Sequence, residues 1–386
     1  MYTILTLNKI SDAGLSNLPA DFNISDKTET PDGVILRSFS MHDMELPQSL
    51  LAVARAGAGV NNIPIDQCTE KGIVVFNTPG ANANAVKELV IAGLLLSSRN
   101  VVGGIEWAKG LEGQADVAKL VEKGKGEFVG PELMGKKLGV IGLGAIGVLV
   151  ANACSALGME VYGYDPFVSV DAAWGIYSSV KKAVSLDEIY SQCDYITVHV
   201  PMNKDTKGMI HADAIAKMKD GVRILNFARA ELVDDEAVKA ALATGKVSFY
   251  VTDFPTENVL GVKNVIPVPH LGASSPESEE NCAAMAAVEL REYLLFGNIR
   301  NSVNFPNCEL PPADKKRITV IHQNIPSVLS ALTSTLASKH INIDNMINKS
   351  KGDLAYTIID ADKGDLADAE SELLNVNGVM RVRVIQ

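Results

Sequence analysis

An apolar segment that runs directly into a glycine-rich turn constrains the fold of this chain most strongly. Between Lys137 and Gly147 the sequence reads KLGVIGLGAIG, a strand-like stretch followed by the pattern GxGxxG. In that pattern Gly142 permits a tight turn, Gly144 lets the backbone approach a pyrophosphate, and Gly147 lets the next helix pack close to the strand. A helix over 148–157 would direct its first N–H groups at the phosphates. The sequence therefore predicts a Rossmann-type dinucleotide site.

An acidic residue after the next strand indicates which dinucleotide binds. The predicted strand 160–165 ends in Asp165, eighteen residues after Gly147, where a carboxylate would accept hydrogen bonds from ribose hydroxyls. The same carboxylate would repel a 2′-phosphate, and residues 166–170 bring no Arg or Lys to neutralise one. The sequence therefore favours NAD over NADP. Alternatively Asp165 caps a turn ahead of Pro166, and the two roles are compatible.

Composition limits the class of protein. With 386 residues the chain is expected to form two or three domains, and its 47% hydrophobic content is typical of a packed globular protein. The formal charge of −11 argues against nucleic acid or an anionic membrane surface as a partner. Five cysteines without CxxC or Cys/His spacing indicate reduced thiols and no metal site. Without a signal peptide or a membrane-length apolar run, we expect a soluble, cytoplasmic protein.

The order of predicted elements indicates an α/β protein with two Rossmann-like, doubly wound parallel-sheet domains. Short apolar strands at 34–36, 51–53 and 73–76 precede a helix at 83–98, and a second long helix is predicted at 279–296. Between them, further strands are predicted at 195–200, 223–227, 249–252 and 265–267. We expect a discontinuous substrate-binding domain (1–98 and 279–306), an NAD-binding domain (99–278) and a ligand in the cleft between them.

The last eighty residues are expected to form a linker followed by a separate unit of about seventy residues. A proline-punctuated polar stretch at 307–316 is the predicted linker, and 317–386 is the predicted module. In this module we expect strands at 317–322, 354–360 and 379–385, helices at 327–339 and 365–374, and a missing or weak second strand near 341–348. This βαββαβ order is typical of a small α+β ferredoxin-like module, with binding, regulation or assembly as its role.

Three polar residues follow predicted strands of the NAD-binding domain. They are Arg229, Asp253 and His270. Because the ends of neighbouring parallel strands meet at one edge of a sheet, residues far apart in sequence can converge there. An arginine suits a carboxylate, and a histidine held by a carboxylate suits removal of a hydroxyl proton. Taken singly, each also has an ordinary interpretation as a surface charge, a turn cap or a loop residue.

At these residues the chain resembles the D-2-hydroxyacid dehydrogenase family, and within it the branch that oxidises 3-phospho-D-glycerate. The similar stretches extend over nearly the whole chain. They are Leu36-Arg-Ser, Ala54-Arg-Ala-Gly-Ala-Gly-Val-Asn, Val75-Phe-Asn-Thr-Pro, the GLGAIG turn, Val198-His-Val-Pro, Asn226-Phe-Ala-Arg and Pro269-His-Leu-Gly-Ala-Ser.

The resemblance implies a role for each matching residue. It makes Arg229 the substrate-orienting residue and His270 the acid/base, with Glu257 hydrogen-bonded to His270. It implies that Asp253 holds the nicotinamide carboxamide and that the dinucleotide is further contacted by Gly142, Gly144, Ala145, Ile146, Gly147, Asp165, Val200, Pro201, Phe227, Ala228, Gly272 and Ala273. The substrate's carboxylate and phosphate would be held by Arg37, Ser38, Arg55 and Asn82.

Three departures from the family pattern affect these expectations. Ala230 replaces a glycine after Arg229, which would restrict the backbone if φ is positive there. The stretch from Asp253 to Glu257 is one residue shorter than usual, which leaves the placement of Glu257 open. Lys87 stands where a small residue is commoner, so it either points to solvent or adds positive charge near the substrate.

The C-terminal module resembles an ACT regulatory domain. The stretches starting at His322 and His340 match a serine-binding signature, in which His322, Asn324 and Asn342 would contact the amino acid. Ser327 stands where that pattern has glycine. Alternatively, Asn324 and Ser327 simply cap the following helix.

The resemblance implies NAD-dependent oxidation of 3-phospho-D-glycerate to 3-phosphohydroxypyruvate, the first step of L-serine biosynthesis, with serine as a possible effector. Two alternatives stay open. One is a relative acting on an unphosphorylated hydroxy acid, such as a glyoxylate or hydroxypyruvate reductase. The other is a non-catalytic NAD-sensing scaffold of the same fold. The resemblance further implies a homodimer or homotetramer.

Overall fold

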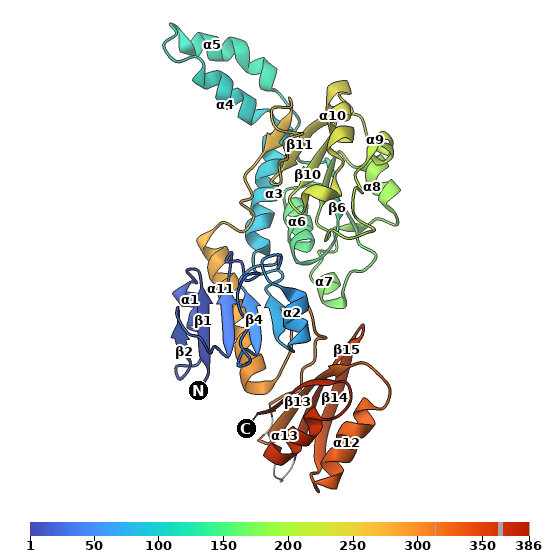
Figure 1. Cartoon of the computed structure of the whole chain (residues 1–386). Coiled ribbons are helices and arrows are strands. Elements are labelled where there is room, and N and C mark those ends of the chain that lie inside the picture. The colour runs from blue at the N-terminus through green and yellow to red at the C-terminus, as the bar shows by residue number, and fades with distance from the viewer. Residues whose placement is uncertain (313, 362–365, 386) are drawn as a thin grey trace. The chain divides into compact units, whose positions relative to one another are not determined.

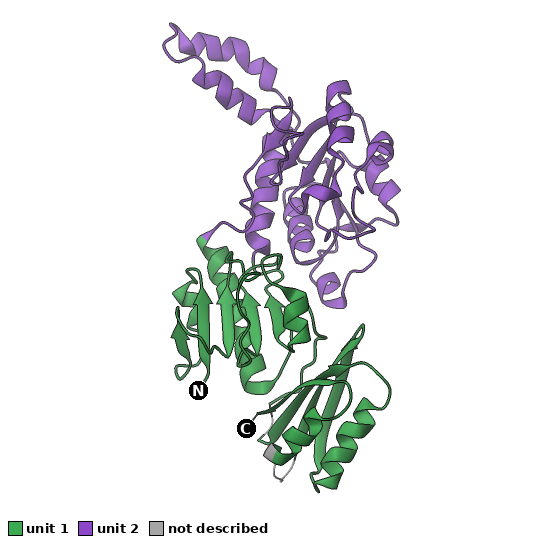
Figure 2. Ribbon diagram, in the orientation of Figure 1, with its two compact units in different colours: residues 1–81, 276–386 green, residues 82–275 purple. Residues whose placement is uncertain are grey.

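The computed structural model of the chain describes residues 1–312, 314–361 and 366–385. These residues form two compact units, each with its own parallel sheet (Figures 1 and 2). The first unit comprises residues 1–81 and 276–386, and the second comprises residues 82–275.

The sheet of the first unit has five strands in the order β2-β1-β3-β4-β5, all parallel. Its elements are β1 (Thr3–Leu7), α1 (Asp12–Leu15), β2 (Asn23–Ser25), β3 (Gly33–Leu36), β4 (Ala52–Arg55), α2 (Ile65–Glu70), β5 (Val74–Asn77) and α11 (Pro276–Phe296). Alternate residues of the strands contribute to two apolar clusters, one that includes α11 and one that includes Cys68 of α2. Burial on both faces explains the continuous apolar sequences of β3, β4 and β5, from which this sheet was predicted.

The C-terminal module is a four-stranded antiparallel sheet with the strand order β14-β15-β13-β16. Its elements are β13 (Lys316–Gln323), α12 (Val328–Ser338), β14 (Ile343–Lys351), β15 (Leu354–Ala361), α13 (Leu366–Leu374) and β16 (Val379–Ile385). This is the predicted ferredoxin-like βαββαβ fold. The expectation of a missing or weak second strand is wrong, because β14 is nine residues long and pairs with β15 along its length. Its side chains are mostly polar and exposed, which hid the strand from a hydrophobic pattern.

The two faces of the module's sheet have different partners. One face packs on α12 and α13. From the other face Ile321, Tyr356 and Ile358 join the apolar cluster that contains Tyr293 and Leu294 of α11. The module and the parallel sheet of the first unit therefore share one hydrophobic core.

Arginines of the module reach the end of α11. Arg383 donates to the carbonyl oxygens of Tyr293 (3.3 Å) and Leu294 (3.0 Å), and its guanidinium lies 4.6 Å from the Tyr293 ring centre. Arg317, which is paired with the buried Asp360, donates to the carbonyl oxygen of Phe296 at 2.8 Å. The last carbonyls of a helix have no partner within it, so these arginines supply donors at the helix end, in addition to the N–H of Gly297 for Tyr293 and the hydroxyl of Tyr2 for Leu294.

The segment 307–312, which the sequence predicts as the start of a linker, is packed against this core. Cys308 is buried, and its backbone forms a bridge with Ile299. Leu310 contacts the same apolar cluster. The described part of the segment is therefore held along its length.

The second unit is a seven-stranded parallel sheet in the order β12-β11-β10-β9-β6-β7-β8. Its elements are α3 (Ala83–Ser98), β6 (Lys137–Ile141), α6 (Ala145–Ala156), β7 (Glu160–Tyr164), α7 (Val170–Trp174), β8 (Lys181–Lys182), α8 (Leu186–Gln192), β9 (Tyr195–Val198), α9 (Ala212–Lys217), β10 (Val222–Asn226), η2 (Ala230–Leu232), α10 (Asp235–Thr244), β11 (Val247–Thr252) and β12 (Val265–Pro267). One face packs on α3 and α6, and the other on α8, α9 and α10. The strand order reverses between β6 and β9, where doubly wound sheets bind dinucleotides.

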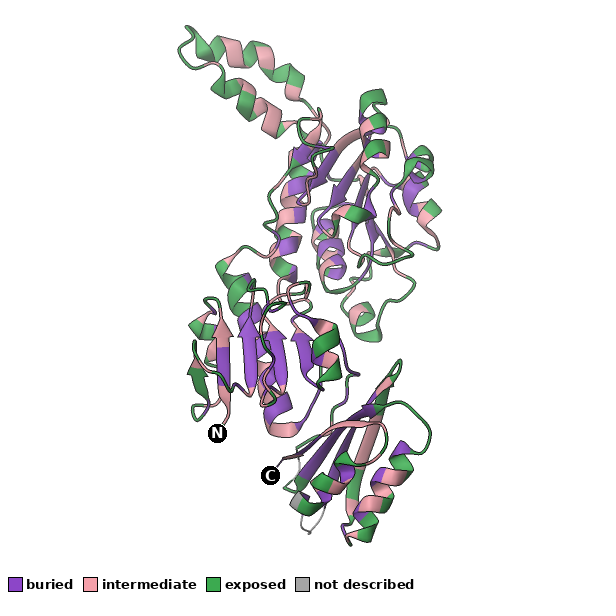
Figure 3. Ribbon diagram, viewed as in Figure 1, coloured by how far each residue is buried: buried purple, intermediate pink, exposed green. Residues whose placement is uncertain are grey.

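A helical arm, residues 101–128, was not expected from the sequence. It consists of α4 (Val101–Lys109), α5 (Val117–Gly124) and the 3-10 turn η1 (Lys125–Phe128), and none of its residues is buried (Figure 3). Trp107 packs on Phe128 with ring centres 5.4 Å apart. In the part of the chain that the structure describes, no single helix is long and apolar enough to cross a bilayer; α3 and α4 together meet that length and composition but are bent by 68°.

The shared core predicts that Gly297 is sensitive to substitution. Gly297 has φ +68, and a Cβ there would lie 2.4 Å from Cγ2 of Thr319 in the module. We expect Gly297→Ala to lower the free energy of unfolding by about 2–4 kcal/mol, from left-handed strain plus overpacking. Urea denaturation of the intact protein measures this.

Gly352 supplies a matched control, because it has φ +60 and no atom within 4 Å of the added Cβ. Gly352→Ala should cost only the conformational part, about 1 kcal/mol. Equal losses in the two variants would mean that the close contact between Gly297 and the module does not contribute to stability.

Candidate functional site

The glycine-rich turn between β6 and α6 is formed by close backbone contacts. Gly142 has φ +93, and a Cβ on it would lie 2.5 Å from the carbonyl oxygen of His199. A Cβ on Gly147 would lie 1.9 Å from the carbonyl oxygen of Gly142. Gly144, in contrast, has no atom within 4 Å of such a Cβ, so space is open beside it. The outer glycines thus permit tight packing, and the middle one leaves room for a pyrophosphate at the start of α6.

Asp165 joins this turn to the strand beside it. Its Oδ2 accepts a hydrogen bond from the N–H of Leu143 at 2.8 Å, and its Oδ1 accepts one from the N–H of Phe167 at 2.8 Å. The turn-capping interpretation is therefore correct. A carboxylate has further lone pairs, so this geometry remains compatible with hydrogen bonds from ribose hydroxyls.

Other residues assigned to the cofactor lie at the carboxyl ends of the central strands. Val200 and Pro201 follow β9, Phe227 and Ala228 follow β10, Asp253 follows β11, and Gly272 and Ala273 lie in the loop after β12. With Ala145 and Ile146 at the first turn of α6, they surround the reversal of strand order.

His199, between β9 and Val200, was not assigned a role from the sequence. Its Nε2 lies 2.9 Å from Oγ1 of Thr197, and its Nδ1 is buried without a hydrogen-bond partner in the structure. Burial lowers the pKa of His199 to about 4, so the ring is neutral near pH 7. A neutral ring beside the turn adds no charge to the predicted dinucleotide site.

Asp253 has the strongest sign of an incomplete polar site. The residue is 2% exposed, and its Oδ1 is buried with no hydrogen-bond partner in the structure. Burial raises the pKa of Asp253 to about 6, against the opposing effects of Arg229 and of the Gly272 backbone N–H. A buried carboxylate oxygen without a donor is costly, and an amide N–H of a bound ligand would satisfy it. The residues present therefore fit a nicotinamide carboxamide.

The side chains of Arg229 and His270 both pack against the ring of Phe254. The Cζ of Arg229 is 5.8 Å from the centre of the Phe254 ring, and the rings of Phe254 and His270 are 4.4 Å apart at 47°. The amide of Asn226 donates to the carbonyl oxygen of Arg229 at 2.8 Å, which fixes the backbone there. Sequence reasoning gave Phe254 no role, although an aromatic residue directly after Asp253 at a strand end was a usable signal.

The structure shows the positions of Ala230 and Glu257, which belong to two of the departures from the family pattern. Ala230 begins the 3-10 turn η2 and does not have a positive φ. Any residue can adopt this conformation, so alanine does not restrict the backbone here. Glu257 is exposed and follows β11 by five residues. Its pairing with His270 stays a prediction.

The residues assigned to the substrate come from both units. In the first unit Arg37 follows β3 and Arg55 ends β4, and these neighbouring strands pair Leu36 with Arg55. The Nε of Arg55 donates to the carbonyl oxygen of Arg37 at 3.1 Å, and the backbone N–H of Ser38 donates to Asn8 Oδ1 at 3.0 Å.

In the second unit Asn82 precedes α3, and its side chain makes no capping hydrogen bond to that helix. Lys87, on the same helix, donates to Oδ1 of Asn84 at 2.6 Å. Its charge is therefore engaged on the surface of α3.

The three residues assigned to an amino-acid effector do not converge within one module. His322 is 2% exposed, with Nδ1 2.8 Å from the carbonyl oxygen of Gln323 and Nε2 2.9 Å from Oγ1 of Thr357. Asn324 follows β13 and donates to the carbonyl oxygen of Gly352 at 3.1 Å. Asn342 precedes β14, whose first residue pairs with Ala361 at the opposite end of the sheet.

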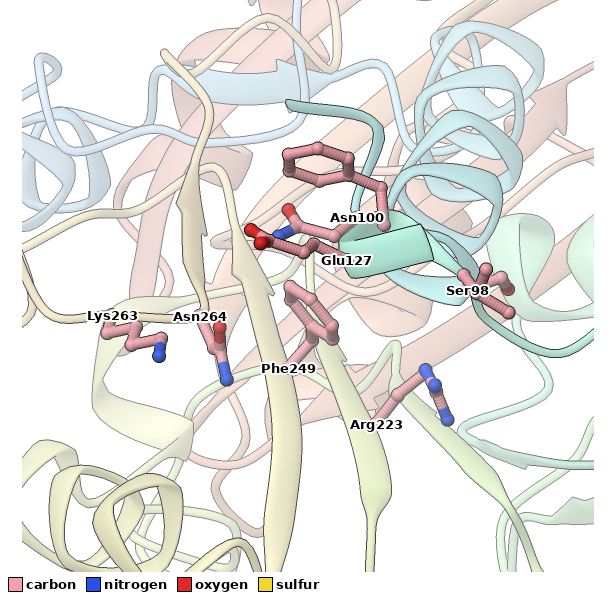
Figure 4. A pocket seen from close by; sticks show the side chains of 9 residues that line it. Ser98, Asn100, Glu127, Arg223, Phe249, Lys263 and Asn264 are labelled. Atoms are coloured by element: carbon pink, nitrogen blue, oxygen red, sulfur yellow. The ribbon is translucent and has the colours of Figure 1, made fainter. Parts of the chain in front are cut away.

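A cavity of about 420 Å³ lies at the amino ends of β10 to β12 (Figure 4). Its lining residues include Arg223, Phe249, Asn264 and Glu127. None of the residues assigned to cofactor, substrate or catalysis lines it. The chemistry predicted for this chain belongs to the carboxyl ends of the same sheet.

Comparison with known proteins identifies the same region. A family model described as D-isomer specific 2-hydroxyacid dehydrogenase, NAD binding domain, matches residues 94–272. A D-3-phosphoglycerate dehydrogenase of Synechocystis sp. is 32% identical over 396 residues, covering 98% of this chain and 68% of its own length. One of Haemophilus influenzae is 32% identical over 354 residues, covering 89% of this chain and 83% of its own.

A crystal structure of NAD+-bound 3-phosphoglycerate dehydrogenase from Entamoeba histolytica has a TM-score of 0.58 at 25% identity, covering 78% of this chain and 98% of that one. The matched family region contains the glycine-rich turn, Asp165, Asp253 and His270. The cofactor is NAD.

The buried oxygen of Asp253 predicts a pH dependence of NADH binding. A donor that satisfies Oδ1 favours the ionised carboxylate, so protonation below pH about 6 opposes binding. We expect the Kd to rise about tenfold between pH 7 and pH 5, because each pH unit below the pKa costs tenfold in the ionised fraction. Titration by NADH fluorescence measures it.

The matched control is Asp253→Asn, which cannot titrate. Its NADH affinity should be lower at pH 7 and nearly constant over the same range. A wild-type affinity that does not change between pH 7 and pH 5 would contradict the role of Asp253.

Proposed function

Because the chain belongs to the D-3-phosphoglycerate dehydrogenases of the D-isomer specific 2-hydroxyacid dehydrogenase family, we propose that it oxidises 3-phospho-D-glycerate to 3-phosphohydroxypyruvate with NAD. This is the first step of L-serine biosynthesis. The observation that carries the proposal is the grouping of Arg229, Phe254 and His270 directly beside the buried, incompletely hydrogen-bonded Asp253.

The reaction removes a hydride from C2 of the substrate and a proton from its hydroxyl, and leaves a carbonyl group. NAD, once bound, would supply the hydride acceptor, and Asp165 and Asp253 are among the residues that would hold it. His270 takes the hydroxyl proton as general base, and Glu257 favours the protonated ring that results. Arg229 orients the substrate carboxylate through its planar fork of N–H donors. Asp253 orients the carboxamide of the cofactor.

Phe254 positions the side chains of Arg229 and His270 and takes no part in proton transfer. Its ring packs against His270 and lies under the guanidinium of Arg229. The side chains of Arg229 and His270 are exposed, so contact with the Phe254 ring restricts their motion.

We assign the phosphate of the substrate to Arg37, Ser38 and Arg55, and a further polar contact to Asn82. Two arginines from adjacent strand ends supply charge and paired donors, which a neutral hydroxymethyl group would leave unsatisfied. This favours a phosphorylated substrate over glyoxylate or hydroxypyruvate. An active enzyme would also exclude the scaffold alternative.

A substrate screen that follows NADH absorbance tests the proposal. We expect kcat/KM for 3-phospho-D-glycerate to exceed that for D-glycerate by about a hundredfold or more, because a polar site rejects an analogue that lacks its partner group. His270→Asn should lower kcat by about a hundredfold, the usual scale of general acid–base catalysis.

The control is NADH affinity, which His270→Asn should leave within the range of the wild type. Near-normal turnover in that variant would contradict the assignment of His270. Equal activity on D-glycerate would contradict the assignment of the phosphate site.

We further propose that the C-terminal module is an ACT domain that binds serine between two copies of the chain. Within one module Gln323 and Lys351 pair with Leu354, whereas Lys316 and Ile343 pair with Ala361. Gln323 and Ile343 therefore lie seven rows apart, about 23 Å along the strands, and Asn324 and Asn342 lie one residue beyond these two ends. One serine cannot span this distance, so contact with both residues requires two modules. His322, buried with both ring nitrogens engaged, fixes the strand end that carries Asn324.

The capping alternative for this loop is not supported. Ser327 makes no side-chain hydrogen bond to α12, and Asn324 is directed to Gly352. Ser327 has φ 73, the left-handed conformation that favours glycine. The loop therefore has the backbone conformation expected for a glycine at this position, and Ser327 adds a side chain there.

We infer a homodimer or homotetramer. The helical arm supports self-association, since Val101, Ile105 and Val117 are exposed on it and none of its residues is buried. Large apolar side chains that are exposed on one element favour association with another protein surface.

We also infer a cytoplasmic location. All five cysteines lie among the described residues and are free and buried. Burial raises the pKa of Cys68 to about 11 and of Cys154 to about 12, which keeps these thiols unreactive. Free thiols of this kind suit a reducing compartment.

The effector proposal predicts heat when serine is titrated into the intact protein. Asn324→Ala and Asn342→Ala should each weaken serine binding about tenfold or more, because each leaves a buried polar group of the ligand unpaired. Ser327→Gly should bind serine more tightly. Light scattering should give a mass of at least twice 41.1 kDa.

A monomeric protein that binds serine would contradict the two-module geometry. No heat at millimolar serine in the wild type and in Ser327→Gly would leave the module an assembly domain.

A further inference from the structure

Arg37, one of the two arginines assigned to the phosphate, is paired with a carboxylate of this chain. Its Nη1 lies 2.5 Å from Oε1 of Glu279, and both residues belong to the first unit. Glu279 is the fourth residue of α11. The two side chains are 35% and 47% exposed, so water and small anions reach the pair.

The backbone that carries Arg37 is held in place. Its carbonyl oxygen accepts hydrogen bonds from Arg55 Nε and from Asn62 Nδ2, each at 3.1 Å. The next two backbone N–H groups, of Ser38 and Phe39, both donate to Asn8 Oδ1. Because the backbone is fixed, a change of partner by Arg37 involves its side chain alone.

An ion pair that is more than a third exposed is weak, because water screens it and the side chains lose rotamer freedom. A phosphate dianion offers the guanidinium two charge-assisted hydrogen bonds and twice the charge of a carboxylate. It can therefore displace Glu279 from Arg37. A neutral group cannot, and a free carboxylate monoanion carries the same charge as Glu279 without being held beside Arg37 by the chain.

We propose that Glu279 sets the affinity of the site for the phosphate of the substrate, because it occupies Arg37 until that phosphate replaces it. This deepens the proposed function and rests on the assignment of Arg37 to that phosphate. The carboxylate lowers the affinity of the site for a phosphate dianion, because the ion pair with Arg37 has to break before the phosphate binds. A substrate without a phosphate group leaves the ion pair intact, so Glu279 has little effect on its affinity.

The test is Glu279→Gln, which keeps the shape of the side chain and removes its charge. We expect KM for 3-phospho-D-glycerate to fall about threefold to tenfold, that is, about 0.7–1.4 kcal/mol. KM for D-glycerate should move less than twofold. Calorimetry with inorganic phosphate on the NADH-bound protein should show affinity rising by the same factor.

Glu277→Gln is the matched control. It removes the same charge from the same turn of α11, but residues two apart on a helix do not share a face. It should change KM and phosphate affinity less than twofold. Glu279→Ala should behave like Glu279→Gln, which guards against an effect of the amide itself.

Each outcome decides between the proposals. A KM that rises or stays constant in Glu279→Gln, or an equal effect in Glu277→Gln, overturns the role of Glu279. A wild type that fails to oxidise 3-phospho-D-glycerate overturns the proposed function. In that case the phosphate calorimetry still decides whether Glu279 competes for Arg37.

Discussion

The cofactor site depends on backbone-to-backbone contact at the glycine-rich turn. A methyl group on Gly147 or Gly142 would overlap a carbonyl oxygen, of Gly142 and of His199 respectively. Without side chains at these two positions, α6 starts against β6 and the end of β9 lies beside both. Asp165 then reaches the turn from β7 through the N–H of Leu143. This packing leaves open space beside Gly144, at the point where the strand order of the sheet reverses.

Much of this arrangement was predictable because the signals are local and repeated. Buried parallel strands give continuous apolar runs, so β3, β12 and α3 were placed within a residue or two. Polar residues at strand ends made Arg229, Asp253 and His270 candidates, and the structure places Arg229 and His270 against one ring, that of Phe254. The polar strand β14 and the helical arm were missed or underestimated because their side chains bury little apolar surface. The roles of Phe254 and Glu279 depend on contacts between residues remote in sequence, Phe254 with Arg229 and His270 and Glu279 with Arg37, and no periodicity encodes them.

Helix α11 is held at both ends by polar contacts within the first unit. Its first turn holds Arg37 through Glu279, and its last carbonyl oxygens accept hydrogen bonds from Arg383 and Arg317 of the module. A helix of 21 residues is about 31 Å long and moves as a stiff body. The module and Arg37, the arginine assigned to the substrate phosphate, therefore contact opposite ends of the same helix.

The shared core also determines how this chain can be divided. Cutting it before Lys316 would remove Ile321, Tyr356 and Ile358 from the cluster around Tyr293 and Leu294, and would expose that apolar surface to water. The same cut would strip the final carbonyl oxygens of α11 of their arginine donors. A truncated fragment would thus gain an exposed apolar face and would tend to aggregate. Loss of activity after such a truncation would therefore indicate damaged packing, and would not by itself show that regulation had been lost.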